Sequence, residues 1–516
     1  MSNSPLQSLS RGVQYLGAGL AAWRSNRSSG ELNREKAQRH LAQRLGRLRG
    51  LPQKLGQWMS MGDLEDESNP LAELRGAAEP IPWERLAPIL EDAWKAPPSE
   101  ICRWIDPKGL AASLGQVHRA TRRDGLEVAI KIQYPGIADS IEGDLRALGW
   151  LSKPVGNLRA GFDLEQYRAV IREGLEEELD YEREAENQQL FQMYSVGLGY
   201  VVPNVLPDLS GAGVLTTAWQ DGESLESVAR EWSEADRSRL GMQLVEQFLE
   251  MGLVRGLLHG DPHPGNYRFR REENGAKVVL YDFGCLCRLS ERERDLLLCL
   301  IRESVDPDST VDPFGLLVAL GFEADLLDPL RHKLPALCRI LFEPFGPGGK
   351  YDFARWKVSE RLEAALGSDR MNFRIAGPAK LVPFLRAFTG LAHALKTLAV
   401  PVFWAGPLAR TLAKRPASLQ SLELPAEVRT GATFSGIAKH LRIRVQEDGA
   451  EKVSLAMPAS AVDRLHELLD PELEAKIRQR GIDVNGLVQR VRENLYAPQE
   501  VFTLQDGNKR VTVSLE

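Results

Sequence analysis

Alternating apolar and polar positions predict β-hairpins at two places in the first 300 residues of the chain. One joins residues 116–120 to residues 126–132 across an Asp124-Gly125 turn. The other joins residues 267–270 to a second apolar run that ends at Asp282-Phe-Gly284, across a turn at residues 273–275. Asp-Gly and Asn-Gly turns between such runs are strong hairpin signals. We therefore expect antiparallel strand pairs here, with two more strands at residues 200–203 and 214–219.

Apolar residues at three- and four-residue steps predict helices elsewhere. The clearest is one long helix from about Asp163 to Met193, preceded by helical and loop segments at residues 83–106. Residues 1–61 and most of 225–420 also read as helical. A linker at 414–435 leads to a compact α+β module, which combines a hairpin of residues 440–445 and 452–456, helices within 460–494, and a hairpin of residues 501–504 and 511–515.

Composition fits a globular protein of several domains. The 516 residues are 43% apolar and 26% charged, and the net charge of −6 gives no reason to expect nucleic acid. Five cysteines without a C-x-x-C pair suit a reducing compartment. No stretch of 18 uninterrupted apolar residues and no signal peptide is visible, so we expect a cytoplasmic protein or one peripheral to the inner face of a membrane.

The segment from Arg24 to Lys54 is strongly basic. It holds nine Lys or Arg against two acids, Glu31 and Glu35. Two interpretations remain open for it: contact with anionic lipid headgroups, or a solvated helix face.

Candidate chemistry centres on His259-Gly-Asp-Pro-His-Pro-Gly-Asn266 and Asp282-Phe-Gly284. Asp261 and Asn266 have the D-x-x-x-x-N spacing of a kinase catalytic loop, in which the carboxylate faces the nucleophile and the amide holds a divalent ion. The predicted hairpin should return Asp282 to the side of Asn266. Two oxygen ligands would then converge on one site for Mg²⁺.

A lysine and a glutamate complete this constellation. Lys131, in Val128-Ala-Ile-Lys131, lies on an apolar strand from which an ammonium can bridge nucleotide phosphates. Kinases fix that lysine with a helix glutamate, and Glu184 is the expected partner, with Glu182 and Glu186 as neighbours that could be confused with it.

Two features of an ordinary protein kinase are missing. The phosphate-binding loop should read G-x-G-x-x-G, but the chain has Gly109-Leu-Ala-Ala-Ser-Leu-Gly115, which leaves less backbone freedom near phosphates. No Ala-Pro-Glu follows Asp-Phe-Gly, so a peptide-docking segment is not visible. An alternative remains for His259-x-Asp261-x-His263, which could place ligands of a zinc or iron hydrolase on one face of an extended chain.

The chain resembles the UbiB (AarF, ADCK) family of atypical kinase-like proteins, because five motifs of that family occur in it in the same order. They are the alanine loop (Gly109–Gly115), Val128-Ala-Ile-Lys131, Glu178-Leu-Asp180, His259–Asn266 and Asp282-Phe-Gly284. Lys54-Leu-Gly-Gln57 matches that family's K-x-G-Q motif. The likeness runs from about residue 40 to 400 and leaves out the C-terminal module. It departs from the family at the loop, where Gly109-Leu110 precede only two alanines.

The resemblance implies an α+β, protein-kinase-like two-lobe fold with an N-terminal helical extension over the cleft and a small C-terminal α+β module. The implied domains are residues 1–70, the extension; 71–220, the small lobe; 221–420, the helical large lobe; and 436–516, a module of unknown role. Lys54, Gly56 and Gln57 belong to the lid, with Lys54 paired to Glu178 and Asp180. Nucleotide, ATP or ADP, is implied under Ala111, Ala112 and Ser113 with Gln116 nearby, and Mg²⁺ on Asn266 and Asp282.

Two functional hypotheses follow. The first is an enzyme, a Mg²⁺-dependent ATPase or small-molecule kinase that uses Asp261, Lys131 and Glu184 and supports ubiquinone or other isoprenoid-lipid metabolism, as the resemblance implies. The second is a nucleotide-gated switch that binds a lipid or a quinone-biosynthesis protein with little catalysis.

Overall fold

The fold was analysed in a computed structural model of the chain, which describes residues 80–112, 114–138, 179–273, 275–306, 308–309, 311–369, 373, 376–415, 438, 440–447, 450–468, 477, 480, 483–493, 496, 498–506 and 509–516. The predicted N-terminal helices, residues 416–435 of the predicted linker at 414–435, and the motif residues Lys54, Gly56, Gln57, Ser113 and Glu178 lie outside these residues. The chain divides into two compact units.

The first unit comprises Met1–Asp236, Leu257–Cys287 and Pro383–Gly390. Its main sheet has the order β1-β3-β4-β6, with β2 paired to β3, and all of its neighbours are antiparallel. Its strands are β1 (Cys102–Ile105), β2 (Leu110–Ala111), β3 (Gly115–Arg122), β4 (Glu127–Gln133) and β6 (Val214–Ala218). The predicted β3–β4 hairpin is confirmed. The strand β1 was missed, because its four residues directly follow a short helix.

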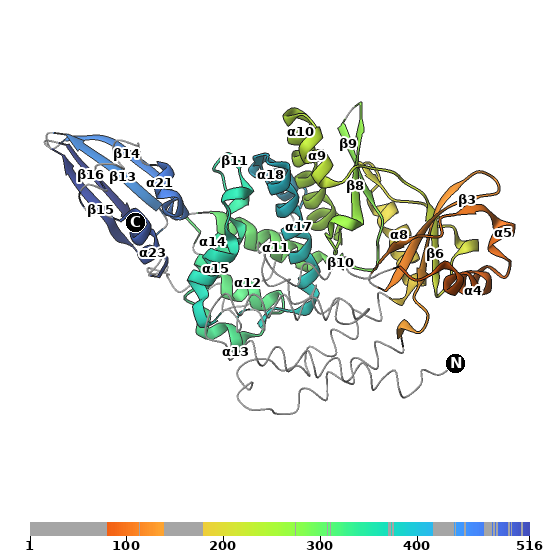
Figure 1. The fold of residues 1–516 in the computed structure, drawn as a ribbon. Coiled ribbons are helices and arrows are strands. Elements are labelled where there is room, and N and C mark those ends of the chain that lie inside the picture. The colour runs from red at the N-terminus through yellow and green to blue at the C-terminus, as the bar shows by residue number, and fades with distance from the viewer. Residues whose placement is uncertain are drawn as a thin grey trace, which may run out of the picture. The chain divides into compact units, whose positions relative to one another are not determined.

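The core of this sheet follows from period-two alternation along β4. Val128, Ile130 and Ile132 are fully buried and pack in one cluster with Leu86 and Leu90 of α4. Figure 1 shows α4 (Trp83–Trp94) and α5 (Pro98–Ile101) beside the sheet. Because successive side chains on a strand point to opposite faces, Lys131 is directed away from this apolar cluster.

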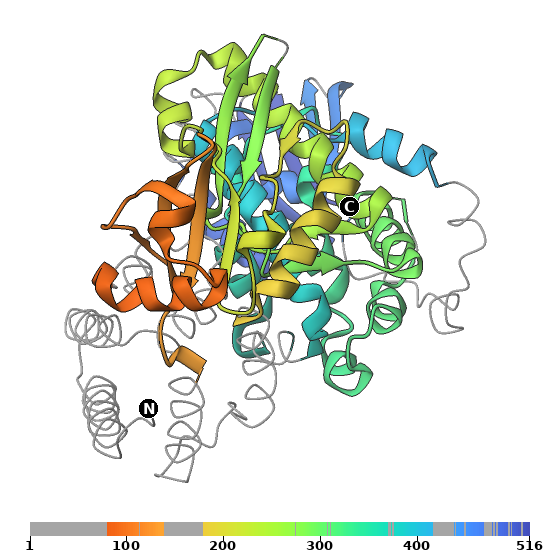
Figure 2. The ribbon, with the colours of Figure 1, turned by 90° about the vertical axis from the view of Figure 1, so that its right-hand side faces the viewer.

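A second, three-stranded sheet has the order β5-β9-β8. It consists of β5 (Tyr200–Val201), β8 (Tyr267–Glu272) and β9 (Gly275–Leu280), and β8 and β9 form the second predicted hairpin, which is confirmed. Its two long green strands run side by side in Figure 2. Strand β7 (Leu257–His259), which leads into the candidate catalytic loop, pairs with β10 (Leu286–Arg288).

The predicted long helix from 163 to 193 is described only from residue 179 onward, and there it is interrupted. Asp180 has a non-helical backbone (φ −91°, ψ 86°), and its carboxylate accepts a hydrogen bond from the Arg183 N–H. Asp is a favoured N-cap because its side chain satisfies a free N–H of the first turn. Helix α8 (Tyr181–Tyr194) therefore begins just after Asp180. A single helix through this point was a wrong prediction.

The second unit comprises Arg237–Gly256, Arg288–Val382 and Leu391–Glu516 and is mostly helical. Within the described residues its helices pack through leucine-rich faces, and Leu296, Ile301, Leu316 and Leu337 are almost fully buried. The longer elements that lie in it wholly or in part are α10 (Glu234–Phe248), the π-helix η3 (Leu249–Arg255), α11 (Glu291–Val305), α12 (Pro313–Ala319), α14 (Leu334–Phe342), α15 (Val358–Leu366), α17 (Val382–Leu398) and α18 (Ala405–Ala413).

The C-terminal module belongs to this second unit. Its antiparallel sheet has the order β14-β13-β16-β15, built from β13 (His440–Glu447), β14 (Ala450–Pro458), β15 (Gln499–Asp506) and β16 (Lys509–Leu515). Both predicted hairpins are confirmed. The 3-10 helix η10 (Ala459–Arg464) contacts β13, and α23 (Val484–Glu493) contacts β15. Figure 1 shows α23 beside this sheet.

A nearly buried arginine joins the module to the helices of the second unit. The Arg361 guanidinium of α15 forms ion pairs with Glu343 and, at 2.8 Å, with Asp463 of η10. The Tyr496 hydroxyl donates to both oxygens of the Asp463 carboxylate, at 3.1 and 2.9 Å. Removing one member of such a group leaves buried charge without compensation.

We expect Asp463→Asn to lower the free energy of unfolding by about 2 kcal/mol, because Arg361 keeps Glu343 but loses its second carboxylate. Urea unfolding measures the change. The matched control is Glu360→Gln, on the same helix, whose ion pair with Lys357 is well exposed; it should change stability by less than about 0.5 kcal/mol. Equal effects of the two substitutions would contradict the structural role of Asp463.

Candidate functional site

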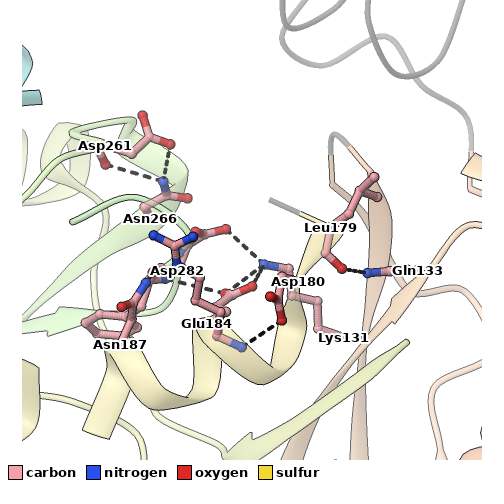
Figure 3. Close-up of polar contacts among 12 residues, drawn as sticks. Lys131, Gln133, Leu179, Asp180, Glu184, Asn187, Asp261, Asn266 and Asp282 are labelled. Carbon is pink, nitrogen blue, oxygen red and sulfur yellow. Dashed lines mark hydrogen bonds and ion pairs between the residues drawn. The ribbon is translucent and has the colours of Figure 1, made fainter. Parts of the chain in front are cut away.

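The candidate site lies in the first unit, around Lys131 of β4. Its ammonium contacts both oxygens of the Glu184 carboxylate at 2.8 Å and the Asp282 carboxylate at 3.0 Å (Figure 3). The Tyr181 ring lies 4.9 Å from the same nitrogen, at cation–π distance. The structure thus brings together three residues that are 53 and 98 positions apart along the chain.

Helix α8 selects which of three nearby glutamates reaches the lysine. Glu182 and Glu186 are exposed, whereas the Glu184 side chain is 1% exposed and faces Lys131. Burial raises the pKa of Glu184 to about 7, although Lys131 works in the opposite direction. Burial by itself would lower the pKa of Lys131, but the carboxylates of Asp282 and Glu184 hold that pKa well above its usual range. One cation is therefore shared by two carboxylates, and the group carries one excess negative charge when both carboxylates are ionised.

Asp282 is held in place by its own tripeptide and by α8. Its second oxygen accepts from the Gly284 N–H at 3.0 Å, and the Asn187 side chain donates to the Phe283 carbonyl at 3.0 Å. Phe283 is fully buried against the rings of Phe191 and His259, at 5.5 and 5.6 Å between centroids. The Asp282 side chain remains 35% exposed. It therefore combines a fixed backbone with a carboxylate that solvent can reach.

Asn266 and Asp261 form a second, linked pair. The short 3-10 turn Pro264–Asn266 brings the Asn266 side-chain nitrogen to 2.8 Å from a carboxylate oxygen of Asp261 (Figure 3). The Tyr281 N–H donates to the Asn266 carbonyl at 3.0 Å, next to the β8–β9 ladder. The hairpin thus returns residue 281 to the side of residue 266, as the sequence predicts.

Asn266 and Asp282 offer donors that suit Mg²⁺. The side-chain nitrogen of Asn266, and not its oxygen, contacts Asp261, so the amide oxygen would be the atom that ligates a metal ion. A solvent-accessible carboxylate and an amide oxygen are the hard ligands that this ion takes, usually together with water and phosphate oxygens. The donor chemistry therefore fits a magnesium–nucleotide complex.

The alanine loop packs against two buried polar side chains, Gln116 and His118. Gly109 has a positive φ of 52°, and a side chain there would strike Gln116 and His118, at 2.7 Å from each. Ala111 pairs with Gln116 in the β2–β3 ladder, and the Ala112 N–H donates to the Gly115 carbonyl at 2.8 Å. Backbone contacts close the turn, which leaves Ala111 exposed at its edge.

Gln116 is placed differently from the expectation. It is fully buried, and its amide accepts from the Ile81 N–H at 2.8 Å and donates to the Ile81 carbonyl at 3.2 Å. Both ends of the amide are engaged with backbone, so direct contact with nucleotide does not fit this arrangement. Gln116 instead ties the segment before α4 to the strand that follows the loop.

The two histidines of the candidate catalytic loop, His259 and His263, contact backbone atoms of nearby residues. The Nε2 atom of His259 contacts the Asp282 carbonyl, and Nδ1 of His263 accepts from the Gly265 N–H at 3.0 Å. No group of three or more His, Cys, Asp or Glu side chains arranged to hold a metal occurs in the part of the chain that the structure describes. The described geometry gives the zinc or iron hydrolase interpretation no support.

Sequence reasoning missed one residue at the site, Arg386. Its guanidinium, from α17, forms an ion pair with the Asp261 carboxylate. No local motif marks this arginine, which lies 125 positions from its partner.

The site and fold define a kinase-like protein, and comparisons with known proteins agree. Residues 73–311 match the model of the ABC1 atypical kinase-like domain. The chain therefore carries a domain of this family, and both the resemblance to UbiB proteins and the α+β kinase-like fold class are confirmed.

The relatives that match the chain carry the word kinase in their names. The chain is 28% identical over 332 residues to "Atypical kinase coq-8, mitochondrial" of Caenorhabditis elegans, covering 62% of this chain and 43% of that protein. It is 33% identical to "Protein ACTIVITY OF BC1 COMPLEX KINASE 8, chloroplastic" of Arabidopsis thaliana (49% and 34%) and 28% identical to "Atypical kinase COQ8B, mitochondrial" of Rattus norvegicus (66% and 65%). The chain thus spans between about a third and two thirds of the length of these relatives.

Among solved structures, the complex of Rv3197 with erythromycin from Mycobacterium tuberculosis aligns with a TM-score of 0.49 at 27% identity. The alignment covers 72% of this chain and 95% of that one. Among the described residues, no helix combines the length and the apolar character needed to cross a membrane.

The raised pKa of Glu184 predicts a pH dependence of stability. An acid whose folded pKa exceeds its unfolded value binds more protons when folded, so its contribution is full below 4.5 and is lost as pH rises towards 7. We expect the free energy of unfolding of the wild type, relative to Glu184→Gln, to fall by about 3 kcal/mol over this range. Denaturant unfolding at several pH values measures this. Glu182→Gln is the exposed control and should follow the wild type, and a flat or rising Glu184 difference would contradict the assignment.

Proposed function

We propose that this protein binds a magnesium–nucleotide complex and hydrolyses ATP or transfers its terminal phosphoryl group to a small, lipid-like acceptor. The observation that supports the proposal most strongly is the shared contact of Lys131 with Glu184 and Asp282. A buried lysine held at two carboxylates, one of them open to solvent, is a pre-assembled phosphate and metal site.

Each residue then has a distinct task. Lys131, oriented by Glu184, would contact nucleotide phosphates, and Asn266 and Asp282 would hold Mg²⁺, which neutralises phosphate charge when bound. Ala111, Ala112 and Ser113 would lie over the nucleotide. Asp261, hydrogen-bonded to Asn266, would accept a hydrogen bond from the acceptor hydroxyl or water and orient it.

The short connection after Asp-Phe-Gly supports an acceptor other than a protein. Helix α11 begins at Glu291, and Ser290 and Glu293 close a capping box at its start. Only residues 285–290 separate Gly284 from this helix, and β10 occupies half of them. In protein kinases the activation segment runs from Asp-Phe-Gly to Ala-Pro-Glu, and six residues leave no room for a comparable one. Water or a small hydroxyl compound therefore suits the site better than a peptide.

One observation favours the switch as a second candidate. Lys131 already contacts Asp282, the carboxylate that Mg²⁺ requires. Binding of the metal must change this contact. A partner protein could recognise the changed conformation even if ATP hydrolysis were slow. The proposed lid residues Lys54, Gly56, Gln57, Glu178 and Asp180 would respond to it, and of these only Asp180 is described, as the N-cap of α8.

Asp282→Asn should reduce Mg²⁺-dependent ATP hydrolysis by on the order of 100-fold, because it removes a charged ligand from the site of developing phosphate charge. Release of phosphate by the purified chain, with and without Mg²⁺, measures this. Asp92→Asn, in an exposed ion pair on α4, is the charge-matched control and should act as wild type. Equal, slow hydrolysis by wild type and Asp282→Asn, with different partner binding, would favour the switch instead.

We further propose that the activity supports ubiquinone or other isoprenoid-lipid metabolism, as the family resemblance implies, with isoprenoid lipids or quinone-biosynthesis proteins as partners. Contact with a membrane surface would come through the basic segment Arg24–Lys54, which lies outside the described residues. Deletion of the gene should change the profile of quinones and related lipids, measured by mass spectrometry. Complementation with the wild type should restore it, whereas an unchanged profile would reject this assignment and leave the ATPase proposal standing.

A further inference from the structure

One face of α17 (Val382–Leu398) packs on the candidate catalytic loop. Three of its residues, spaced by three and four positions, meet three consecutive residues of the loop, Gly260-Asp-Pro262. A Cβ built on Gly260 would lie 3.1 Å from the Cβ of Pro383, and one built on Gly390 would lie 2.0 Å from the Cβ of Pro262. Residues at such spacings share one face of a helix. The approach is therefore close enough that Gly390 tolerates no larger residue without movement.

Arg386 lies in the middle of this face. Its guanidinium forms an ion pair with one oxygen of the Asp261 carboxylate, and both side chains are 22% exposed. The other oxygen accepts from the Asn266 amide at 2.8 Å. The carboxylate is thus held from two sides, by groups that come from a distant helix and from its own loop. A charge-assisted contact of this kind is stronger and more directional than one between neutral groups.

We propose that Arg386 is a positioning residue for Asp261, and that α17 is the element that sets the orientation of the acceptor-binding carboxylate. This inference rests on the proposed function. Asn266 extends the link, because its side-chain nitrogen contacts Asp261 while its amide oxygen would be the atom that holds the proposed metal. Asn266, Asp261 and Arg386 then form one chain of contacts.

The chain of contacts has a chemical consequence. With each of its two oxygens held by a donor, the Asp261 carboxylate has a fixed direction in which to accept a hydrogen bond from an O–H group. Phosphoryl transfer through a loose, metaphosphate-like transition state needs an aligned nucleophile more than an early proton transfer. The arrangement thus suits water or a small hydroxyl as the acceptor.

Steady-state ATP hydrolysis by Arg386 variants of the full chain tests the proposal. We expect Arg386→Gln to lower kcat by on the order of 10- to 100-fold with little change in the KM for ATP, because nucleotide contacts lie elsewhere. Arg386→Lys, which keeps the charge but not the planar fork, should recover part of the loss, and added guanidinium should partly rescue Arg386→Ala. Arg230→Gln, an exposed arginine of α9 (Leu225–Glu231), is the matched control and should act as wild type.

Gly390→Ala tests the same idea from the packing side. Its added methyl would meet Pro262 and shift α17 away from the loop, so kcat should fall while KM stays constant. Leu385→Ala, at an exposed position of the same helix, is its control. Thermal unfolding of each variant shows whether a lower kcat comes from a misplaced Asp261 or from a protein that is not folded. If Gly390→Ala does not fold, the kcat of Arg386→Lys still tests the proposal.

Unchanged kcat in Arg386→Gln, or a raised KM at constant kcat, would overturn the proposal. If the wild type itself hydrolyses no nucleotide, the proposed function fails. The contact between Arg386 and Asp261 can then still be tested through the free energy of unfolding. In a double-mutant cycle of Arg386→Gln and Asp261→Asn, the two destabilisations should not add. Additive effects would show that Arg386 does not hold Asp261.

Discussion

The site depends on one buried ammonium that two carboxylates share. Lys131 neutralises one negative charge, but Glu184 and Asp282 can bring two, one of them on a fully buried side chain. Burial is the main cause that raises the pKa of Glu184 to about 7, and the Asp282 carboxylate adds to it, while the two carboxylates hold the pKa of Lys131 well above its usual range. A proton or a second cation relieves the excess negative charge. A Mg²⁺ ion bound to Asp282 would do so at a place where phosphate charge also needs neutralising. The electrostatics of the site thereby favour the magnesium–nucleotide complex that it is proposed to bind.

Elements of regular secondary structure place Lys131, Glu184 and Asp282 next to one another. Period-two alternation places the apolar residues of β4 in the core and Lys131 on the opposite face. The N-cap at Asp180 fixes where α8 begins, and this start brings Glu184 rather than Glu182 or Glu186 to the lysine. The β8–β9 hairpin returns Asp282 to the neighbourhood of Asn266. These steps rest on apolar packing, a side-chain helix cap and a strand ladder, all of which lie within the protein itself.

Local signals in the sequence predicted most of these parts. Alternation and Gly-containing turns were sufficient for the hairpins, and motif spacing pointed to Lys131, Glu184, Asp261, Asn266 and Asp282. The break before α8 was missed because apolar spacing continues across Asp180, whose capping role depends on backbone angles. The burial of Gln116 depends on Ile81, 35 residues away. Arg386 could not be found, because its ion pair with Asp261 arises only when α17 packs on the loop. The roles of these residues remain proposals that their geometry supports.

Anomalous diffraction from a crystal grown with Mn²⁺ and a non-hydrolysable ATP analogue tests the central claim most directly. The account predicts an anomalous peak within ligand distance of Asp282 and Asn266, with Lys131 still on Glu184 and turned from Asp282 to the phosphates. Nucleotide bound elsewhere, or bound with no metal at Asp282 and with the Lys131–Asp282 contact intact, would contradict it.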